Sequence, residues 1–465
     1  MPLSEARVDR PPFRPHRPEA SWLAFLLAAA VGPTAGCVAR AGQASAPPAV
    51  VLVSIDTLRP DHLGCYGYAK PTSPEIDRFR RQAVLLRCAI AQAPSTLASH
   101  ASMLTSLPPQ HHGASVERLS ALRPGVVTLT ELLRRAGFAT ASFNGGGQLD
   151  RSWGLDRGFS TYVSATDGST ADVGDDTLDQ EVARAVDWLD HAGRRPFFLF
   201  LHTYEVHHPY TPSPERLRQM ETGYTGSLPP HISIALLEKI NSGQRRLAPG
   251  DLAHVEAAYD AEIASADAAF GRLLQSLRSR GLYESTLVVL TSDHGEAFGE
   301  RGKVGWHGDA LFDEQIRIPM ILKLPRARLA GATIESQVRA IDLAPTVLSL
   351  LSLPVPPEFS GTAIDLAGGA PAHPPWAVAS IDGRPKTAAV RTRRWKWYDG
   401  RLYDLVHDPR ETHDLAARRP DVEESLEGRL LAILRSRELA PTTPIEPGDE
   451  LKERLRALGY ASSVD

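Results

Sequence analysis

The chain of 465 residues has few cysteines, almost no excess of one charge and no long hydrophobic run. Its three cysteines exclude a disulfide scaffold, although Cys65 and Cys88 could still pair in an oxidising compartment. A net charge of −4, from 51 basic and 55 acidic residues, gives no sign of nucleic-acid binding. The apolar stretch Trp22–Val31 is too short to cross a bilayer, which takes about 20 residues. What remains is a globular composition, with room for one large α/β domain and a smaller one.

The first residues resemble a bacterial export signal. Several arginines precede the apolar stretch, and small residues lead directly to Cys37, as at a lipoprotein cleavage site, although Thr34 stands where Leu is usual. We therefore predict a signal peptide of lipoprotein type over residues 1–37 and a linker over 38–48. The protein would be secreted or periplasmic, with a lipid on Cys37 as its membrane anchor. An uncleaved anchor is the alternative.

Three apolar runs read as strands buried on both faces of a sheet, and amphipathic helical stretches lie between them. The runs are "AVVLVSI" from Ala49, "PFFLFLH" from Pro196 and "TLVVLTS" from Thr286. Alternation of strands and helices predicts an α/β fold with a central, mostly parallel sheet flanked by helices. We assign residues 49–370 to this domain.

The last part of the chain changes in pattern. Alternating apolar and polar residues surround Asp399-Gly400, which predicts a β-hairpin. The segment "RPDVEESLEGRLLAIL" then reads as a helix. Residues 371–465 are therefore predicted to form a smaller C-terminal α+β subdomain.

Metal-ligating residue types follow all three apolar runs. Asp56 ends the first, Glu205 and His207 follow the second, and Asp293-His294 ends the third. Ligands of parallel α/β sheets bind beyond the carboxyl ends of the strands, so these side chains are expected to converge. A lone Asp after a strand is usually a cap, but three such ends together favour a metal site.

Two further segments could join this site. The Gly-rich stretch after Asp293 carries His307, which could reach the same strand ends or simply lie in a surface loop. In "STLASHASMLTS", helical spacing of apolar residues places a helix start at Ser95 or Thr96. A helix N-terminus favours an anion, and a hydroxyl there beside a metal can attack a phosphate or sulfate ester.

The ordered motifs resemble the sulfatase family within the alkaline phosphatase superfamily, from Ala49 to the last predicted helix. The segments that carry the resemblance are "VVLVSIDTLRPDHLGCYGY", "TLASHASMLTS", "FFLFLHTYEVHHPY", "TLVVLTSDHGEAFGE", "IRIPMILKLP", "AIDLAPTVLSLL" and "RRWKWYDGRLYDLVHDPRETHDL". The resemblance implies an alkaline phosphatase-like fold. It also implies metal ligands at Asp56, Asp293 and His294, with Thr96 at the nucleophile position and Glu205 as a weaker candidate ligand.

Catalytic roles carry over to four residues. Thr96 stands where sulfatases have a Cys or Ser that becomes formylglycine, and His100 stands where they have the supporting Arg. His207 and His307 match positions that bind the substrate or act on the leaving group, and that hold a second metal in dinuclear relatives. Threonine does not become formylglycine, and "FNGGGQL" replaces the usual Gly-Lys-Trp-His segment, so these departures favour the threonine-nucleophile branch of the superfamily.

The resulting hypothesis is a metal-dependent hydrolase of sulfate or phosphate esters, with phosphodiester or phosphonate substrates favoured. Because His294 and Thr57 reduce the number of hard oxygen ligands, Zn²⁺ or Mn²⁺ is favoured over Ca²⁺. One ion is expected, and a second if Glu205, His207 and His307 cluster. The expected substrate is a small anionic ester or a glycan- or lipid-linked one. The alternatives are a sulfuric ester hydrolase without formylglycine, an envelope phosphoethanolamine-type transferase, and a non-catalytic anion- or glycan-binding relative.

Overall fold

The computed structural model describes residues 49–164, 177–192, 195–221, 223–368, 376–381, 387–434 and 442–460. The predicted signal peptide, its Cys37 and the linker lie outside these residues. Within the described ranges, no helix is long and apolar enough to cross a membrane. Cys65 and Cys88 are both free thiols.

An eight-stranded sheet forms the centre of the fold, in the order β11-β2-β10-β7-β1-β6-β4-β5. Only β10 runs antiparallel to its neighbours, so the predicted mostly parallel sheet is confirmed. In sheet order the strands are β11 (Thr333–Arg339), β2 (Val84–Ile90), β10 (Arg317–Lys323), β7 (Thr286–Thr291), β1 (Ala49–Ile55), β6 (Phe197–Thr203), β4 (Ala139–Asn144) and β5 (Thr161–Ser164).

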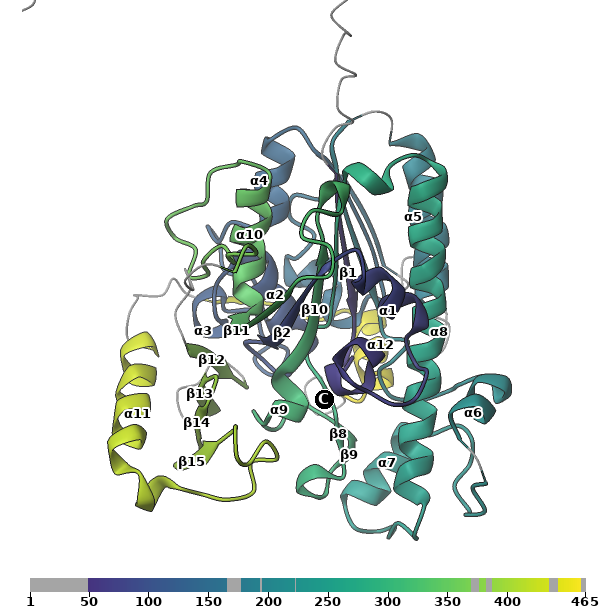
Figure 1. The fold of residues 1–465 in the computed structure, drawn as a ribbon, viewed down its shortest axis with the longest axis vertical. Coiled ribbons are helices and arrows are strands. Elements are labelled where there is room, and N and C mark those ends of the chain that lie inside the picture. The colour runs from purple at the N-terminus through teal and green to yellow at the C-terminus, as the bar shows by residue number, and fades with distance from the viewer. Residues whose placement is uncertain are drawn as a thin grey trace, which may run out of the picture. The chain divides into compact units, whose positions relative to one another are not determined.

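Helices cover both faces of this sheet (Figure 1). Strand β1 shows why its sequence is continuously apolar: Val51 and Val53 enter one core, whereas Val50 and Leu52 enter the other. The first core takes residues from α1 (Pro74–Arg80), α5 (Leu178–His191) and α8 (Asp251–Ser279). The second takes residues from α2 (Thr96–Thr105), α4 (Leu129–Arg135) and α10 (Leu343–Leu350).

A separate antiparallel sheet forms the C-terminal subdomain. Its strands are β12 (Trp376–Ser380), β13 (Ala388–Thr392), β14 (Trp395–Tyr398) and β15 (Arg401–Asp404), and α11 (Pro420–Leu434) packs on it. The predicted hairpin is confirmed, because β14 pairs with β15 across Asp399 and Gly400. Both turn residues have positive φ, at 52° and 69°, as a tight hairpin turn of this type requires.

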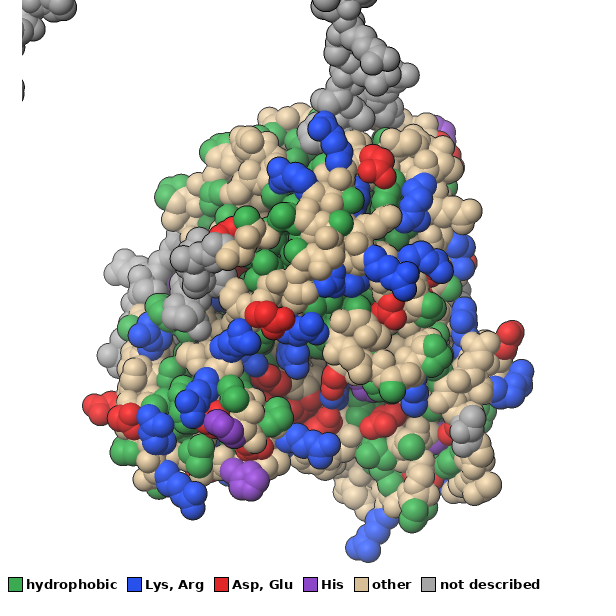
Figure 2. Space-filling model, viewed as in Figure 1, with side chains coloured by type: hydrophobic (Ala, Val, Ile, Leu, Met, Phe, Trp, Pro, Cys, Tyr) green, Lys and Arg blue, Asp and Glu red, His purple; other side chains and the backbone are tan. Residues whose placement is uncertain are grey.

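Buried ion pairs join this subdomain to the main sheet. Asp313, in α9 (Asp313–Ile316), accepts hydrogen bonds from Arg391 of β13 at 2.9 and 2.7 Å and from Lys396 of β14 at 2.9 Å. The Lys396 side chain is fully buried, so its charge depends on these partners. In Figure 2, acidic and basic side chains gather around a hollow on this face. Arg391 and Asp313 line a cavity of about 650 Å³ here.

The remaining elements surround the carboxyl edge of the central sheet or connect to it. They are α3 (Pro109–His112), β3 (Ser120–Ala121), α6 (Pro214–Met220), α7 (Ile234–Asn241), β8 (Ala297–Phe298), β9 (Val304–Trp306), β16 (Thr443–Pro444) and α12 (Asp449–Ala457). The segment 442–460 leaves the subdomain and packs on the main domain, since β16 pairs with β3 and α12 contributes Leu451 and Leu455 to the α2-side core. The boundary between residues 370 and 371 stays a prediction.

Candidate active site

The ends of β1 and β7 bring Asp56, Asp293 and His294 together, with all three side chains fully buried. His294 Nε2 lies 3.7 Å from Asp56 Oδ1 and 3.5 Å from Asp293 Oδ2. Both of these carboxylate oxygens lack a hydrogen-bond partner. Buried oxygens without a donor are costly, and two of them beside an imidazole nitrogen are a donor set that fits a divalent cation. The residues present therefore fit the metal that the sequence predicts.

Thr96 is the first residue of α2, directly after the N-cap position at Ser95. Its hydroxyl donates a hydrogen bond to Asp56 Oδ2 at 3.0 Å and lies 3.5 Å from His294 Nε2. The helix N-terminus adds the partial positive charge of its free N–H groups at the same point. The structure therefore brings the predicted nucleophile to the predicted metal ligands.

Charge in this cluster is tightly coupled. Burial and the charge of Asp293 raise the pKa of Asp56 well above its usual range. Burial opposes ionisation of Asp293, but His294, His100 and His202 outweigh it and lower its pKa to about 2. The two carboxylates raise the pKa of His294 against the effect of its burial. Two buried carboxylates thus share the single positive charge of one imidazolium. A divalent cation would balance their negative charges better.

His100 and His202 contact the residues around the Thr96 hydroxyl. His100 Nδ1 donates to the carbonyl of Thr96 at 2.8 Å, and its Nε2 accepts from the Ser54 hydroxyl at 2.9 Å. Burial lowers the pKa of His100 to about 4, so the ring is neutral at pH 7 and holds the first turn of α2. His202 Nε2 lies 3.2 Å from Asp56 Oδ2. Sequence reasoning missed His202, whose only signal is a single imidazole inside the apolar run of β6.

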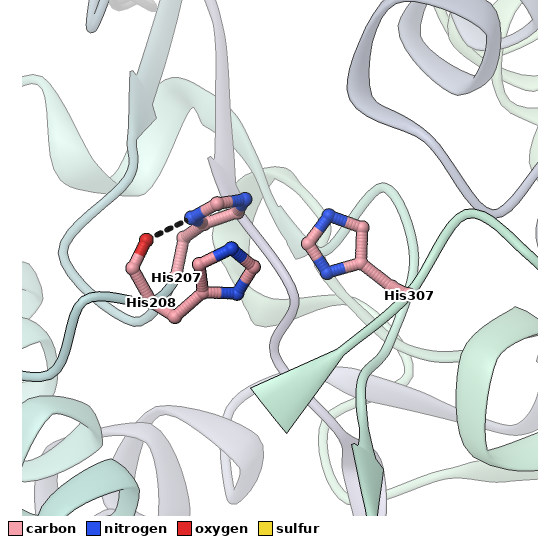
Figure 3. A group of neighbouring side chains, drawn as sticks. All are labelled: His207, His208 and His307. Atoms are coloured by element: carbon pink, nitrogen blue, oxygen red, sulfur yellow. Dashed lines mark hydrogen bonds between the residues drawn. The ribbon is translucent and has the colours of Figure 1, made fainter. Parts of the chain in front are cut away.

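Three histidines form a second cluster beside the first (Figure 3). His207, His208 and His307 each offer a ring nitrogen within 4.8 Å of the others. The sequence predicted His207 and His307 here but not His208, because side chains of adjacent residues rarely point at one ion. In this turn the rings of His207 and His208 instead lie 4.2 Å apart, centroid to centroid.

Hydrogen bonds fix which ring nitrogens carry the protons. His208 Nδ1 and His307 Nδ1 donate to Glu296 Oε1 at 2.9 and 3.0 Å, and His207 Nδ1 donates to the carbonyl of His208. Burial disfavours the charged form of Glu296, but His208 and His307 outweigh this effect and hold the pKa of Glu296 far below its usual range. The Tyr210 hydroxyl donates a further hydrogen bond to the same carboxylate. Burial also lowers the pKa of His207 well below normal and that of His307 to about 4.

With their Nδ1 atoms donating in this way, the three rings offer Nε2 to one another's neighbourhood (Figure 3). His207 Nε2 has no hydrogen-bond partner. Metal-binding histidines commonly donate Nδ1–H to a carboxylate in this way, which orients the ring so that Nε2 can bind the ion. This cluster too has the donor chemistry of a divalent-cation site.

Glu205 is not brought to either cluster. Its carboxylate accepts a hydrogen bond from the backbone N–H of Leu178 at 2.9 Å, at the start of α5. There it stabilises the positive end of that helix. Burial raises the pKa of Glu262 to about 8, and the negative charge of Glu205 contributes to this rise. The chain turns sharply after β6, so Glu205 and His207 point to different surroundings although only one residue separates them.

Thr57, directly after Asp56, has a φ of 53°, which a β-branched residue rarely adopts. Three contacts hold it there: its N–H approaches Asp293 Oδ1 at 3.4 Å, its hydroxyl donates to the Val206 carbonyl at 3.2 Å, and its carbonyl accepts from Tyr259 at 2.8 Å. Backbone strain of this kind is concentrated at functional sites. Here it turns the chain sharply at the end of β1.

The fold and the site are those of an ester hydrolase with an alkaline phosphatase-like sheet and a buried hydroxyl at a helix N-terminus beside carboxylates and imidazoles. The sequence model of the Sulfatase family matches residues 48–353. The chain therefore belongs to the sulfatase family, and it is a sulfatase-like ester hydrolase.

Individual relatives agree with this placement. The chain is 28% identical to arylsulfatase K of Bos taurus over 300 residues, and it spans about half of that relative, 54% of each chain being covered. A phosphonate monoester hydrolase of Agrobacterium radiobacter has a similar fold, with a TM-score of 0.67, 20% identity and coverage of 83% of this chain and 95% of that one. So does a protein solved with its substrate D-glucosamine-2-N,6-O-disulfate, with a TM-score of 0.68, 20% identity and coverage of 84% and 99%.

Proposed function

We propose that this protein is a metal-dependent hydrolase of phosphate or sulfate esters that uses the unmodified Thr96 as its nucleophile. The observation that carries the proposal is the Thr96 hydroxyl, 3.0 Å from Asp56 Oδ2 and 3.5 Å from His294 Nε2 at the N-terminus of α2. Because a threonine lacks the primary carbon from which formylglycine is made, the usual sulfatase nucleophile is excluded. The hydroxyl itself must react.

Asp56, Asp293 and His294, together with Thr96, would hold the principal ion. A divalent cation bound there would supply positive charge that favours the alkoxide of Thr96 and the oxygens of the substrate anion. Within the chain itself, Asp56 Oδ2 accepts the hydroxyl hydrogen bond and is the nearest base for its proton. Attack of Thr96 Oγ1 on phosphorus or sulfur then expels the leaving alcohol and leaves a covalent ester on Thr96, which water hydrolyses.

The residues do not all play equivalent parts. His100 does not point at the substrate position, so we assign it to positioning Thr96 through the helix backbone. His207 and His307 were predicted to act on the leaving group, but their Nε2 atoms are acceptors rather than donors. We therefore propose that they, with His208, hold a second ion. Three imidazoles at the second site, and His294 beside the oxygen ligands of the first, favour Zn²⁺ or Mn²⁺ over Ca²⁺.

Two substrate classes compete. A threonine nucleophile and the absence of the Lys and His that the family places in the region of Asn144 favour phosphodiesters and phosphonates. Similarity to arylsulfatase K favours sulfate esters as the second candidate. Anionic glycans or lipid-linked esters are the proposed natural substrates, and secretion with a lipid on Cys37 remains part of the proposal. A transferase is the less favoured alternative.

The test is a parallel assay of purified protein supplied with Zn²⁺, Mn²⁺ or Ca²⁺. Aryl sulfate, phosphate monoester, phosphate diester and phosphonate monoester substrates are compared by kcat/KM. The proposal expects turnover that Thr96→Ala abolishes, with diester or phosphonate fastest. Fastest turnover of the aryl sulfate would support the second candidate, and retained turnover in Thr96→Ala would remove the nucleophile assignment.

A further inference from the structure

The segment 442–460 packs firmly on the loops of the active site, far in sequence from every other residue there. Its start is fixed by β16, which pairs with β3, and by Ile445, whose N–H donates to the Leu119 carbonyl at 2.8 Å. Leu451 and Leu455 of α12 are buried in the α2-side core. The segment is therefore an integral part of the main domain.

The packing is closest at three consecutive glycines, Gly145–Gly147, which follow β4. Arg454 donates to the carbonyl of Gly145 at 3.1 Å. A Cβ atom at Gly147 would lie 2.6 Å from Leu458 Cδ1, so Leu458 occupies the space that a side chain there would need. The loop thus presents no side chains at these positions, and residues of the segment 442–460 occupy that space instead.

The end of α12 is a Schellman motif that aims Tyr460 into the site. The N–H of Tyr460 donates to the Leu455 carbonyl at 2.8 Å, and the N–H of Gly459 donates to the Arg456 carbonyl at 3.0 Å. Gly459 has a φ of 88°, and a Cβ there would lie 3.2 Å from His208 Nε2. Only glycine combines this backbone conformation with so close an approach to the histidine cluster.

The Tyr460 hydroxyl lies 2.8 Å from His307 Nε2. Because Glu296 accepts the proton on His307 Nδ1, the Nε2 atom is an acceptor and Tyr460 donates to it. The ring centroids of His307 and His294 are 4.6 Å apart, and the Thr96 hydroxyl lies 3.5 Å from His294 Nε2. The phenol O–H is therefore a neutral donor at the edge of the site that holds the nucleophile.

We propose that Tyr460 is a substrate-binding residue of this site: once a metal ion takes the His307 Nε2 lone pair that now accepts from the phenol O–H, the hydroxyl donates its hydrogen bond to an oxygen of the bound phosphoryl or sulfuryl group. This inference rests on the proposed function. When an anion occupies the space next to Thr96, its oxygens are better acceptors than a neutral imidazole. The covering segment also keeps water away from the reacting atoms, since Thr96, Asp56 and Asp293 are already fully buried.

The test compares Tyr460→Phe with Tyr283→Phe in the full-length, metal-supplied protein. Tyr283 is the matched control, because its hydroxyl also donates one hydrogen bond, to Gln82 at 2.7 Å. Tyr283 lies just before β7, at the amino end of the parallel strands, whereas the site lies at their carboxyl end. The probes are orthovanadate and inorganic phosphate, with dissociation constants from titration calorimetry. Turnover of the best substrate and the thermal midpoint are measured on the same samples.

The inference expects Tyr460→Phe to bind both anions about 10- to 100-fold more weakly, the change expected from one hydrogen bond to a charged group. Tyr283→Phe should bind them as the parent protein does. Unchanged or tighter anion binding in Tyr460→Phe would overturn the role of Tyr460, as would an equal loss in Tyr283→Phe. Anion binding and turnover absent from the parent protein itself would instead contradict the proposed function on which the inference rests.

Discussion

The Thr96 hydroxyl donates a hydrogen bond to Asp56 across 3.0 Å, although the two residues belong to different elements, α2 and the end of β1. This contact joins the proposed nucleophile to a carboxylate whose second oxygen, Oδ1, has no hydrogen-bond partner. Hydroxyl, carboxylate and imidazole thus meet in a fully buried cluster.

Removal of metal should abolish activity and lower the thermal midpoint, because the buried carboxylates lose their only divalent counter-charge. Elemental analysis of the reloaded protein should find two ions per chain. Glu296→Gln, which replaces the charged carboxylate that His208 and His307 donate to by a neutral amide, should weaken binding of one of the two ions about 10- to 100-fold. Asp190→Asn, which breaks a surface ion pair with Arg280, is the control. Two ions bound with unchanged affinity in Glu296→Gln would contradict the second site.

Glu205→Gln should leave metal content and turnover unchanged. Its carboxylate contacts the N-terminus of α5 rather than either cluster, so the expected cost is stability, at most about 1 kcal/mol from the lost charge at the helix end. The pKa of Glu262 should fall, because one of the two causes that raise it is removed. Metal analysis and denaturant unfolding check this. Loss of a bound ion in Glu205→Gln would show that Glu205 is a metal ligand.

The sequence predicted the strand-end residues well and the long-range contacts poorly. Asp56, Asp293 and His294 follow from one rule, that parallel strands present their carboxyl ends at a common edge. Glu205 obeys the same spacing but is carried away by the turn after β6. Tyr460 reaches the site only through packing of α12 on the Gly145–Gly147 loop, and no local pattern encodes such a contact.

Two histidines at the site, His202 and His208, were not predicted from the sequence for the same physical reason. His202 looks like part of an apolar strand, because period-two burial does not distinguish a core position from one that contacts a buried carboxylate. His208 is not predicted from the sequence because side chains of adjacent residues rarely point at one ion, a rule that fails inside this turn. Sequence patterns report the local conformation, whereas these contacts depend on which loops the fold brings together.

Acid should loosen the junction of the C-terminal subdomain. Asp313 is buried, but Arg391 and Lys396 outweigh the effect of burial and hold its pKa far below the usual range. Because the folded pKa is lowered, this ion cluster contributes its full stability above the unfolded pKa of about 4, and the contribution falls as the pH drops below that value. Unfolding free energies measured from pH 7 to pH 3 should show the loss.

Asp313→Asn should remove that pH dependence and cost about 3–5 kcal/mol at pH 7, because it leaves the buried Arg391 without its carboxylate partner and leaves the buried Lys396 with Glu411 alone. Asp190→Asn again serves as the control and should leave the pH profile as it is. An Asp313→Asn protein with the parental stability and the parental acid profile would show that the junction is held by other contacts.

The most direct test of the account is whether Thr96 becomes covalently modified during turnover. Metal-supplied protein is mixed with its best substrate, quenched rapidly in acid and digested, and the peptide that contains Thr96 is sequenced by mass spectrometry. The account predicts a phosphoryl or sulfuryl group on Thr96, present during turnover and absent from Thr96→Ala, while Thr105→Ala, altered in the same helix away from the site, behaves as the parent. An active protein with no adduct on Thr96, or full activity in Thr96→Ala, would contradict it.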